Sequence, residues 1–404
     1  MENPHQLALF FGAALLFALV SKVLTRKWLT APMVFVAFGL LTGAGGLGWL
    51  TFQPDSEWIK LLTEVTLMLV LFADASQIRV SALRHRVALP ARLLGISMPL
   101  TIAAGTAVAM LLMPDWSVWE AALVATVLAP TDAALGQAVV SNEAVPGPIR
   151  EALTVESGLN DGIALPVVLV FLALATTEVG DGSGWLWFWA GQVILGPIAG
   201  LAIGSLSGWS LDRARSVGWT SPAALTVGGL ATVALCYLGA EAIGGNGFMA
   251  TFVGGMAFGA RASHVEGQVH EFLESEGQLL MWMVFTVLGC LYALPALVAA
   301  EPMHWLYALL SLTVIRGIPT AISLIGTKLP WQTVGFLGWF GPRGLASILF
   351  GLLLVEEVEL TTGDALFQVV VLTVILSVVL HGLTAAWAAS GYGKWAEGQA
   401  PPQA

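Results

Sequence analysis

The sequence predicts an all-α polytopic membrane protein with about thirteen transmembrane helices. Its composition is the first observation, because 57% of the 404 residues are hydrophobic and only 10% are charged, whereas soluble domains carry about 25% charged residues. The second is a series of apolar runs that approach the roughly 20 residues needed to cross a bilayer. The third is that the charges between these runs alternate in sign. Nothing resembles a basic nucleic-acid-binding face.

Each predicted helix is an apolar run bounded by a charged loop or by glycine and proline residues. The second and ninth runs are short and rich in glycine. The predicted spans, in chain order, are 6–24, 32–50, 58–77, 88–112, 118–140, 148–176, 186–208, 222–240, 246–260, 272–298, 303–325, 331–355 and 365–390.

The loops between the spans predict how the chain is oriented. Loops after odd-numbered spans carry basic residues such as Lys22 and Arg213, and loops after even-numbered spans carry acidic ones such as Asp115 and Glu301. Basic loops stay on the cytoplasmic side of a membrane. We therefore expect a protein of the cell (inner) membrane with its N terminus outside and its C terminus in the cytoplasm.

An acidic residue lies near the end of the third span, in the string VLFADASQIRV. Asp74 comes about one helical turn before the basic loop. It either lines the cytoplasmic mouth of an ion path or faces water at the membrane boundary.

The fifth and twelfth spans each combine a helix breaker with a charge near the centre of the membrane. The fifth contains Pro130 and Asp132, and the twelfth contains Pro342 and Arg343. Such pairs indicate interrupted helices in two related halves of a transporter. Asp132 could neutralise N-terminal half-helix ends and Arg343 C-terminal ends. The alternative is two proline kinks whose charges pair locally.

The sixth span carries the string VESGLNDG inside a long apolar run. An ionisable side chain at membrane depth costs roughly 2.5–3.5 kcal/mol by insertion scales and indicates an ion or proton site. Residues four apart share a helix face. Glu156 therefore lies on one face with Asn160, and Ser157 lies on a neighbouring face with Asp161.

The face with Ser157 and Asp161 predicts a site for a monovalent cation, because hard cations bind oxygen ligands. Thr131 and Asp132 of the interrupted fifth span would complete the set of ligands. The alternative is that Asp161 only accepts hydrogen bonds that lock two helices together.

Arg316 lies in the eleventh span, in the apolar string LTVIRGIPTA. Arginine keeps its proton in proteins, so Arg316 needs a counter-charge. Glu156 is the preferred partner, because Asp161 is needed for ion exchange. Arg343 is the rival partner for Glu156.

Other residues give no sign of chemistry. The patterns HExxH, GxSxG and the glycine-rich phosphate loop are missing, so we expect neither enzymatic activity nor a cofactor. Cys236 and Cys290 lie singly in apolar runs and favour packing roles. The loop with His264 and His270 is interpreted as solvated, with pH sensing as the alternative.

Taken together, these strings resemble the monovalent cation:proton antiporters, in the sodium/proton exchanger branch that carries an Asn-Asp pair. The likeness covers essentially all predicted spans. It implies two inverted six-helix repeats with two interrupted crossing helices, a homodimer and electroneutral exchange. The motifs that carry it, in chain order, are Pro130-Thr131-Asp132, Glu156-Ser157-x-x-Asn160-Asp161, Arg316 and Gly341-Pro342-Arg343-Gly344.

The resemblance also implies roles for individual residues. Asp161 would bind a cation and a proton alternately. Glu156 would pair with Arg316. The other ion-site residues would be Asp132, Thr131, Ser157 and Asn160.

The same resemblance implies a division of the chain into a moving core and a scaffold that forms the dimer. The expected segments are 1–112 (scaffold helices and the first core helix), 113–176 (core helices with the ion site), 177–209 (a linking helix), 210–300 (scaffold helices), 301–390 (core helices) and 391–404 (a disordered cytoplasmic tail).

The chain departs from the family pattern at two positions. Ala133 follows the Thr-Asp pair where many members have proline. Asp74 stands one position after the place where many members have glutamate following phenylalanine. The second departure leaves the role of Asp74 open.

We therefore expect secondary active antiport of Na⁺ or Li⁺ against H⁺, by alternating access around a site at the membrane midplane. Exchange of K⁺ for H⁺ is the main alternative. A different ion-coupled transporter on the same scaffold, a selective channel and an intramembrane enzyme are the others.

Overall fold

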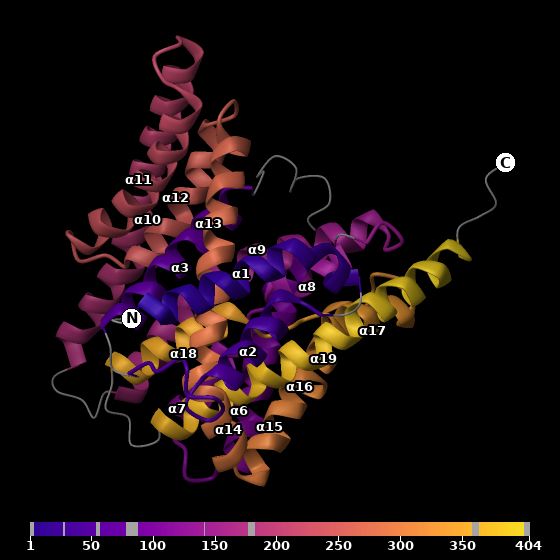
Figure 1. The fold of residues 1–404 in the computed structure, drawn as a ribbon. Coiled ribbons are helices and arrows are strands. Elements are labelled where there is room, and N and C mark those ends of the chain that lie inside the picture. The colour runs from indigo at the N-terminus through magenta and orange to yellow at the C-terminus, as the bar shows by residue number, and fades with distance from the viewer. Residues whose placement is uncertain are drawn as a thin grey trace. The chain divides into compact units, whose positions relative to one another are not determined.

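The structure is a computed structural model that describes residues 4–26, 29–53, 57–77, 88–140, 142–176, 182–357 and 363–399. Within these ranges the regular structure is helical and contains no strand (Figure 1). The all-α prediction is therefore confirmed. The basic loop that holds Arg84 and the last five residues of the predicted tail lie outside the described ranges.

Every range predicted as a span contains helix in the structure. Two short π-helical segments, η1 and η2, lie inside longer helices. In chain order the elements are α1 Pro4–Arg26, α2 Ala31–Thr42, α3 Glu57–Ser76, α5 Ala88–Arg92, η1 Leu93–Ser97, α6 Met98–Leu112, α7 Val118–Val127, α8 Ala133–Val140, α9 Gly147–Thr176, α10 Gly182–Ser216, α11 Pro222–Glu241, α12 Gly247–Arg261, α13 Glu266–Val287, η2 Leu288–Ala293, α14 Leu294–Ala299, α15 Pro302–Leu312, α16 Val314–Ser323, α17 Trp331–Trp339, α18 Leu345–Glu357 and α19 Gly363–Glu397.

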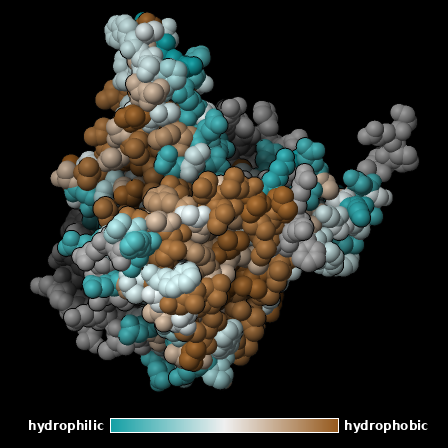
Figure 2. Space-filling view, viewed as in Figure 1, coloured by the Kyte–Doolittle hydropathy of each residue, from teal (hydrophilic) through white to brown (hydrophobic). Residues whose placement is uncertain are grey.

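Eight helical stretches among the described residues are long and apolar enough to cross a membrane, and α2 and α7 are shorter apolar helices. Large apolar side chains are exposed on these helices, and Figure 2 shows them as brown areas. On α1, for example, Leu15 is 63% exposed and Leu19 is 73% exposed. Such faces suit contact with lipid. The chain is thus a multi-pass membrane protein, while the count of about thirteen crossings stays a prediction.

Four helix ends lie six or more residues from the predicted ones. Two of them lengthen helices, because α10 runs to Ser216 rather than to 208 and α13 begins at Glu266 rather than at 272. The second span was expected to reach residue 50, but α2 ends at Thr42 because the following segment is glycine-rich. Gly48 there has a φ of 68°, which glycine adopts readily. The tail was expected to be disordered from residue 391, but α19 continues to Glu397. Tyr392 explains this, because its ring stacks on Phe336 with centroids 4.2 Å apart.

The helices group into two compact units, which are described separately. The first comprises Met1–Lys60, Ala88–Asn160 and Trp282–Ala404, and the second comprises Leu61–Val87 and Asp161–Met281. This grouping does not follow the predicted core and scaffold segments, and that division stays a prediction.

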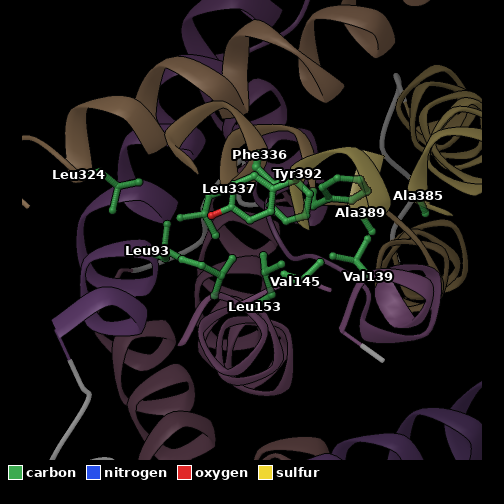
Figure 3. Close-up of a cluster of buried hydrophobic side chains, with 12 residues drawn as sticks. Leu93, Val139, Val145, Leu153, Leu324, Phe336, Leu337, Ala385, Ala389 and Tyr392 are labelled. Atoms are coloured by element: carbon green, nitrogen blue, oxygen red, sulfur yellow. The ribbon is translucent and has the colours of Figure 1, made fainter. Parts of the chain in front are cut away.

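In the first unit, a buried apolar cluster packs α8, which follows the first interruption, together with α17, which precedes the second (Figure 3). Phe336 and Leu337 of α17 pack there with Val139 of α8, Leu153 of α9 and Tyr392 of α19. Thr333 and Tyr392 add a hydrogen bond of 2.9 Å between their hydroxyls. The cluster therefore anchors α8, α9 and α17 against α19.

In the second unit, α10 and α12 approach backbone to backbone. Glycines recur at every fourth position of α10 from Gly196 to Gly208. A Cβ at Gly200 would overlap the carbonyl of Ala250, and a Cβ at Gly204 would overlap that of Gly254. Stripes of small residues with this spacing allow close helix packing in lipid.

We predict that Gly204→Ala destabilises the protein by about 1–3 kcal/mol, because the added methyl group has no space. The measurement is the melting temperature of the purified protein in detergent. Gly191→Ala on the same helix is the matched control, since a Cβ there would lie 3.9 Å from its nearest neighbours. Equal melting temperatures for the two variants would contradict this account of the α10–α12 contact.

Candidate functional site

Two interrupted helices meet at their breaks in the first unit. Residues 128–132 separate α7 from α8, and residues 340–344 separate α17 from α18. The backbone N–H of Asp132 donates to the carbonyl of Pro342 at 2.8 Å. Both predicted interruptions are therefore present, and they contact each other directly.

The carboxylate of Asp132 caps two half-helices. One oxygen accepts from the N–H of Leu135 in the first turn of α8 at 3.2 Å. The other accepts from the N–H of Leu345, the first residue of α18, at 2.6 Å. Helix N-termini carry partial positive charge and unpaired N–H groups. Asp132 therefore neutralises N-terminal ends, as predicted, and Gly344 is required beside it because a Cβ there would overlap the carboxylate.

Arg343 serves the opposite ends. It is completely buried, and its guanidinium donates to the carbonyl of Gly341 and, at 3.4 Å, to the carbonyl of Ser311 in the last turn of α15. Its backbone N–H donates to the hydroxyl of Ser377 at 2.6 Å. A cation at carbonyl groups near a helix C-terminus is favourable. The Gly341 carbonyl follows the end of α17, where Arg343 was predicted to act, while the Ser311 carbonyl belongs to α15, outside the two interrupted spans.

Glu156 of α9 forms a buried ion pair with Arg316 of α16. The guanidinium nitrogen Nη2 lies 2.8 Å and 3.1 Å from the two carboxylate oxygens. Both side chains are at most 4% exposed. The preferred pairing is thus observed, whereas Arg343 bonds to backbone carbonyls. Gly341 makes room for Arg316, because a Cβ at Gly341 would overlap its side chain.

Polar groups of α9 meet the α7–α8 break at Thr131. The Thr131 hydroxyl lies 3.2 Å from the Ser157 hydroxyl and accepts from the Asn160 amide at 2.7 Å. That amide also donates to the Thr131 carbonyl at 3.3 Å. The amide oxygen of Asn160 is buried and has no hydrogen-bond partner among the described residues. The structure therefore brings Thr131, Ser157 and Asn160 together.

Asp161 is the next residue of α9 and is partly exposed. The helix is continuous from Gly147 to Thr176. Helix geometry consequently places Asp161 one turn after Ser157 on the same face. Asp74 lies near the end of α3, in the second unit, and is also partly exposed. Its contribution to an ion path stays a prediction.

Sequence reasoning missed the polar residues that α18 and α19 supply to the breaks. The Ser347 hydroxyl donates to the carbonyl of Val127, the last residue of α7, at 2.8 Å. His381 is completely buried and lies within hydrogen-bond distance of Ser377 and of the Trp339 carbonyl. The available signal was the four-residue spacing of Ser377 and His381, which places both on one face of a helix.

Comparison with known proteins adds the family. The sequence matches the family described as sodium/hydrogen exchanger, transmembrane, over residues 11–391. It is 26% identical to the K⁺/H⁺ antiporter NhaP of Alkalimonas amylolytica, covering 100% of this chain and 69% of that one. It is 28% identical to the Na⁺/H⁺ antiporter 2 of Zygosaccharomyces rouxii, covering 85% of this chain but only 45% of the relative.

The fold has a solved counterpart. The sodium proton antiporter MjNhaP1 of Methanocaldococcus jannaschii superposes with a TM-score of 0.77 at 21% identity, over 96% of this chain and 99% of that one. The shared fold agrees with the family match, which spans most of the sequence. The chain belongs to the transmembrane sodium/hydrogen exchanger family, a family of monovalent cation:proton antiporters.

Proposed function

We propose that the chain exchanges Na⁺ or Li⁺ for H⁺ across the cell (inner) membrane, with Asp161 as the group that binds the two in turn. One observation carries the proposal, namely the meeting of α9 with the α7–α8 break. There the hydroxyls of Thr131 and Ser157 lie 3.2 Å apart, and Asp161 follows Ser157 by one turn on the same helix face. Hydroxyl and carboxylate oxygens are the ligands that a hard cation requires.

Competition for one carboxylate explains coupling without a separate gate. Asp161 holds either a proton or a cation, so loading one requires release of the other. Both loaded forms carry the same charge, and one cation is therefore exchanged for one proton. Asn160 and the oxygens of Thr131 and Ser157 would contribute to cation binding, and Asp132 would hold the break in place while contributing its charge.

Alternating access would come from movement of one group of helices around this site. Half-helix ends at the midplane suit such a site, because their dipoles provide charge stabilisation without a fixed cage. We further propose a homodimer with the N terminus outside and the C terminus in the cytoplasm, following the positive-inside rule.

Exchange of K⁺ for H⁺ is the second candidate. It is favoured by the names of two similar proteins, the NhaP of Alkalimonas amylolytica and the NhaP2 of Shewanella oneidensis, both called K⁺/H⁺ antiporters. Both ions accept the same oxygen ligands, and their selection depends on the size of the site.

Proteoliposomes with an imposed pH gradient test the proposal. We expect that adding Na⁺ or Li⁺ dissipates the gradient in a saturable way, that K⁺ does so less, and that clamping the membrane potential leaves the rate unchanged. A larger response to K⁺ would select the second candidate. No response to any of the three cations would refute cation:proton exchange by this chain.

A further inference from the structure

One face of α19 contacts the break between α17 and α18. That helix contacts both α17 and α18 (Figure 1). Ser377 and His381 are four residues apart on α19 and both are completely buried. Burying an imidazole in an apolar helix costs free energy unless its nitrogen atoms are hydrogen-bonded. The hydrogen-bond partners of His381 therefore show which groups it holds in place.

His381 holds the start of the break. Its Nε2 lies 3.0 Å from the carbonyl of Trp339, the last residue of α17. A carbonyl only accepts, so Nε2 carries the hydrogen. The same carbonyl accepts from the N–H of Gly341 at 2.9 Å. The indole of Trp339 donates to Thr384 of α19 at 3.0 Å, which fixes this end of α17 a second time.

Ser377 holds the end of the break. Its hydroxyl oxygen accepts from the backbone N–H of Arg343 at 2.6 Å. The hydroxyl hydrogen is then available for Nδ1 of His381, which lies 3.2 Å away. Nδ1 also lies 3.1 Å from the backbone carbonyl of Ser377. In a neutral imidazole whose Nε2 carries the hydrogen, Nδ1 only accepts, so its partner is the Ser377 hydroxyl and not that carbonyl. A continuous chain of hydrogen bonds therefore runs from Arg343 through Ser377 and His381 to Trp339.

The bonds from His381 to Trp339 and from Arg343 to Ser377 fix the break on both sides of Pro342. Pro342 lies between Trp339 and Arg343, and its carbonyl accepts the N–H of Asp132. The residue before Asp132 is Thr131, whose hydroxyl contacts Ser157. Two contacts, Asp132 with Pro342 and Thr131 with Ser157, therefore connect the α17–α18 break to the polar groups on α9.

We propose that His381 and Ser377 are positioning residues that set the geometry of the cation site through the α17–α18 break. They do not contact the cation in this account. The expected change in KM rests on the proposed cation:proton exchange, whereas the expected change in deuterium exchange does not depend on transport.

The test compares two replacements of His381. The amide nitrogen of glutamine reaches about as far as Nε2, whereas that of asparagine reaches only as far as Nδ1. His381→Asn therefore loses the bond to the Trp339 carbonyl, and His381→Gln keeps it. We expect faster deuterium exchange in the peptide 340–347 of His381→Asn, and a KM for Na⁺ raised about tenfold with little change in maximal rate. His381→Gln should restore both.

Thr373→Val is the matched control, because the Thr373 hydroxyl donates to the Val369 carbonyl of its own helix and, among the described residues, to neither break. If His381→Asn shows the deuterium exchange and the KM of the wild type, the proposal is overturned. Faster deuterium exchange with an unchanged KM would show that the break does not set the geometry of the cation site. If His381→Asn does not fold, Ser377→Ala replaces it and should give the same two changes. A wild type without cation-driven flux would refute the proposed function, while deuterium exchange would still decide on the anchors.

Discussion

Asp161→Asn is expected to fold and to lose cation-dependent proton flux completely, down to the level of liposomes without protein. Asparagine has nearly the shape of aspartate but can neither release a proton nor offer a negative charge. If Asp161 is shared between the two ions, removing its charge removes both halves of the cycle. The measurement is the dissipation of a pH gradient by Na⁺ or Li⁺ at equal amounts of reconstituted protein.

The matched control is Asp364→Asn, which makes the same chemical change at an exposed position in the first turn of α19. It should transport like the wild type. Elution as a single species in detergent would show that the Asp161 variant is folded. Retention of flux by a folded Asp161→Asn would remove Asp161 from its proposed role and leave the cation site without its central ligand.

The sequence predicted the local features of the site well. The coincidence of Pro130 with Asp132, and of Pro342 with Arg343, located both breaks. The four-residue spacing in α9 placed Glu156, which pairs with Arg316, on a different helix face from Ser157. These features depend on helix period and on the missing N–H of proline, both of which are properties of short segments.

Features that depend on distant parts of the chain could not be predicted in the same way. Asp132 caps Leu345, which lies 213 positions away, and nothing near either residue encodes that contact. His381 of α19 bonds to the Trp339 carbonyl of α17, and no spacing within either helix encodes that contact. The need for glycine at position 341 could not be predicted either, because only the folded structure shows that Gly341 borders the side chain of Arg316.

The site consequently separates charges that hold the fold from the charge proposed to move ions. Asp132 and Arg343 complete helix ends, and Glu156 compensates Arg316. Neutralising these buried charges internally lowers the cost of keeping interrupted helices in a membrane. The arrangement also means that the two classes of residue should respond differently to mutation, with loss of stability in one class and loss of transport alone in the other.

Among the charges that hold the fold, the Glu156–Arg316 pair should cause the largest loss of stability when it is broken. Glu156→Gln or Arg316→Gln alone leaves one buried charge uncompensated, and breaking a buried pair in this way typically costs about 3–5 kcal/mol. We expect each single variant to lower the melting temperature strongly. The double variant has no uncompensated charge, so its loss should be smaller than the sum of the two single losses.

A pair at the surface of the same chain serves as the control for this cycle. The Asp212 carboxylate lies 3.1 Å from Nδ1 of His264, and their side chains are 20% and 73% exposed; pairs open to water contribute about 0–1 kcal/mol. The carboxylate also accepts the backbone N–H of His264 at 2.8 Å, and the amide oxygen of an asparagine can still accept it. Asp212→Asn should therefore change the melting temperature little. If the losses at Glu156 and Arg316 were small, or added without coupling, the pair would not be the electrostatic support of the break. Arg316 would then have to be stabilised by the carbonyl of Leu337, which lies 3.5 Å from its guanidinium.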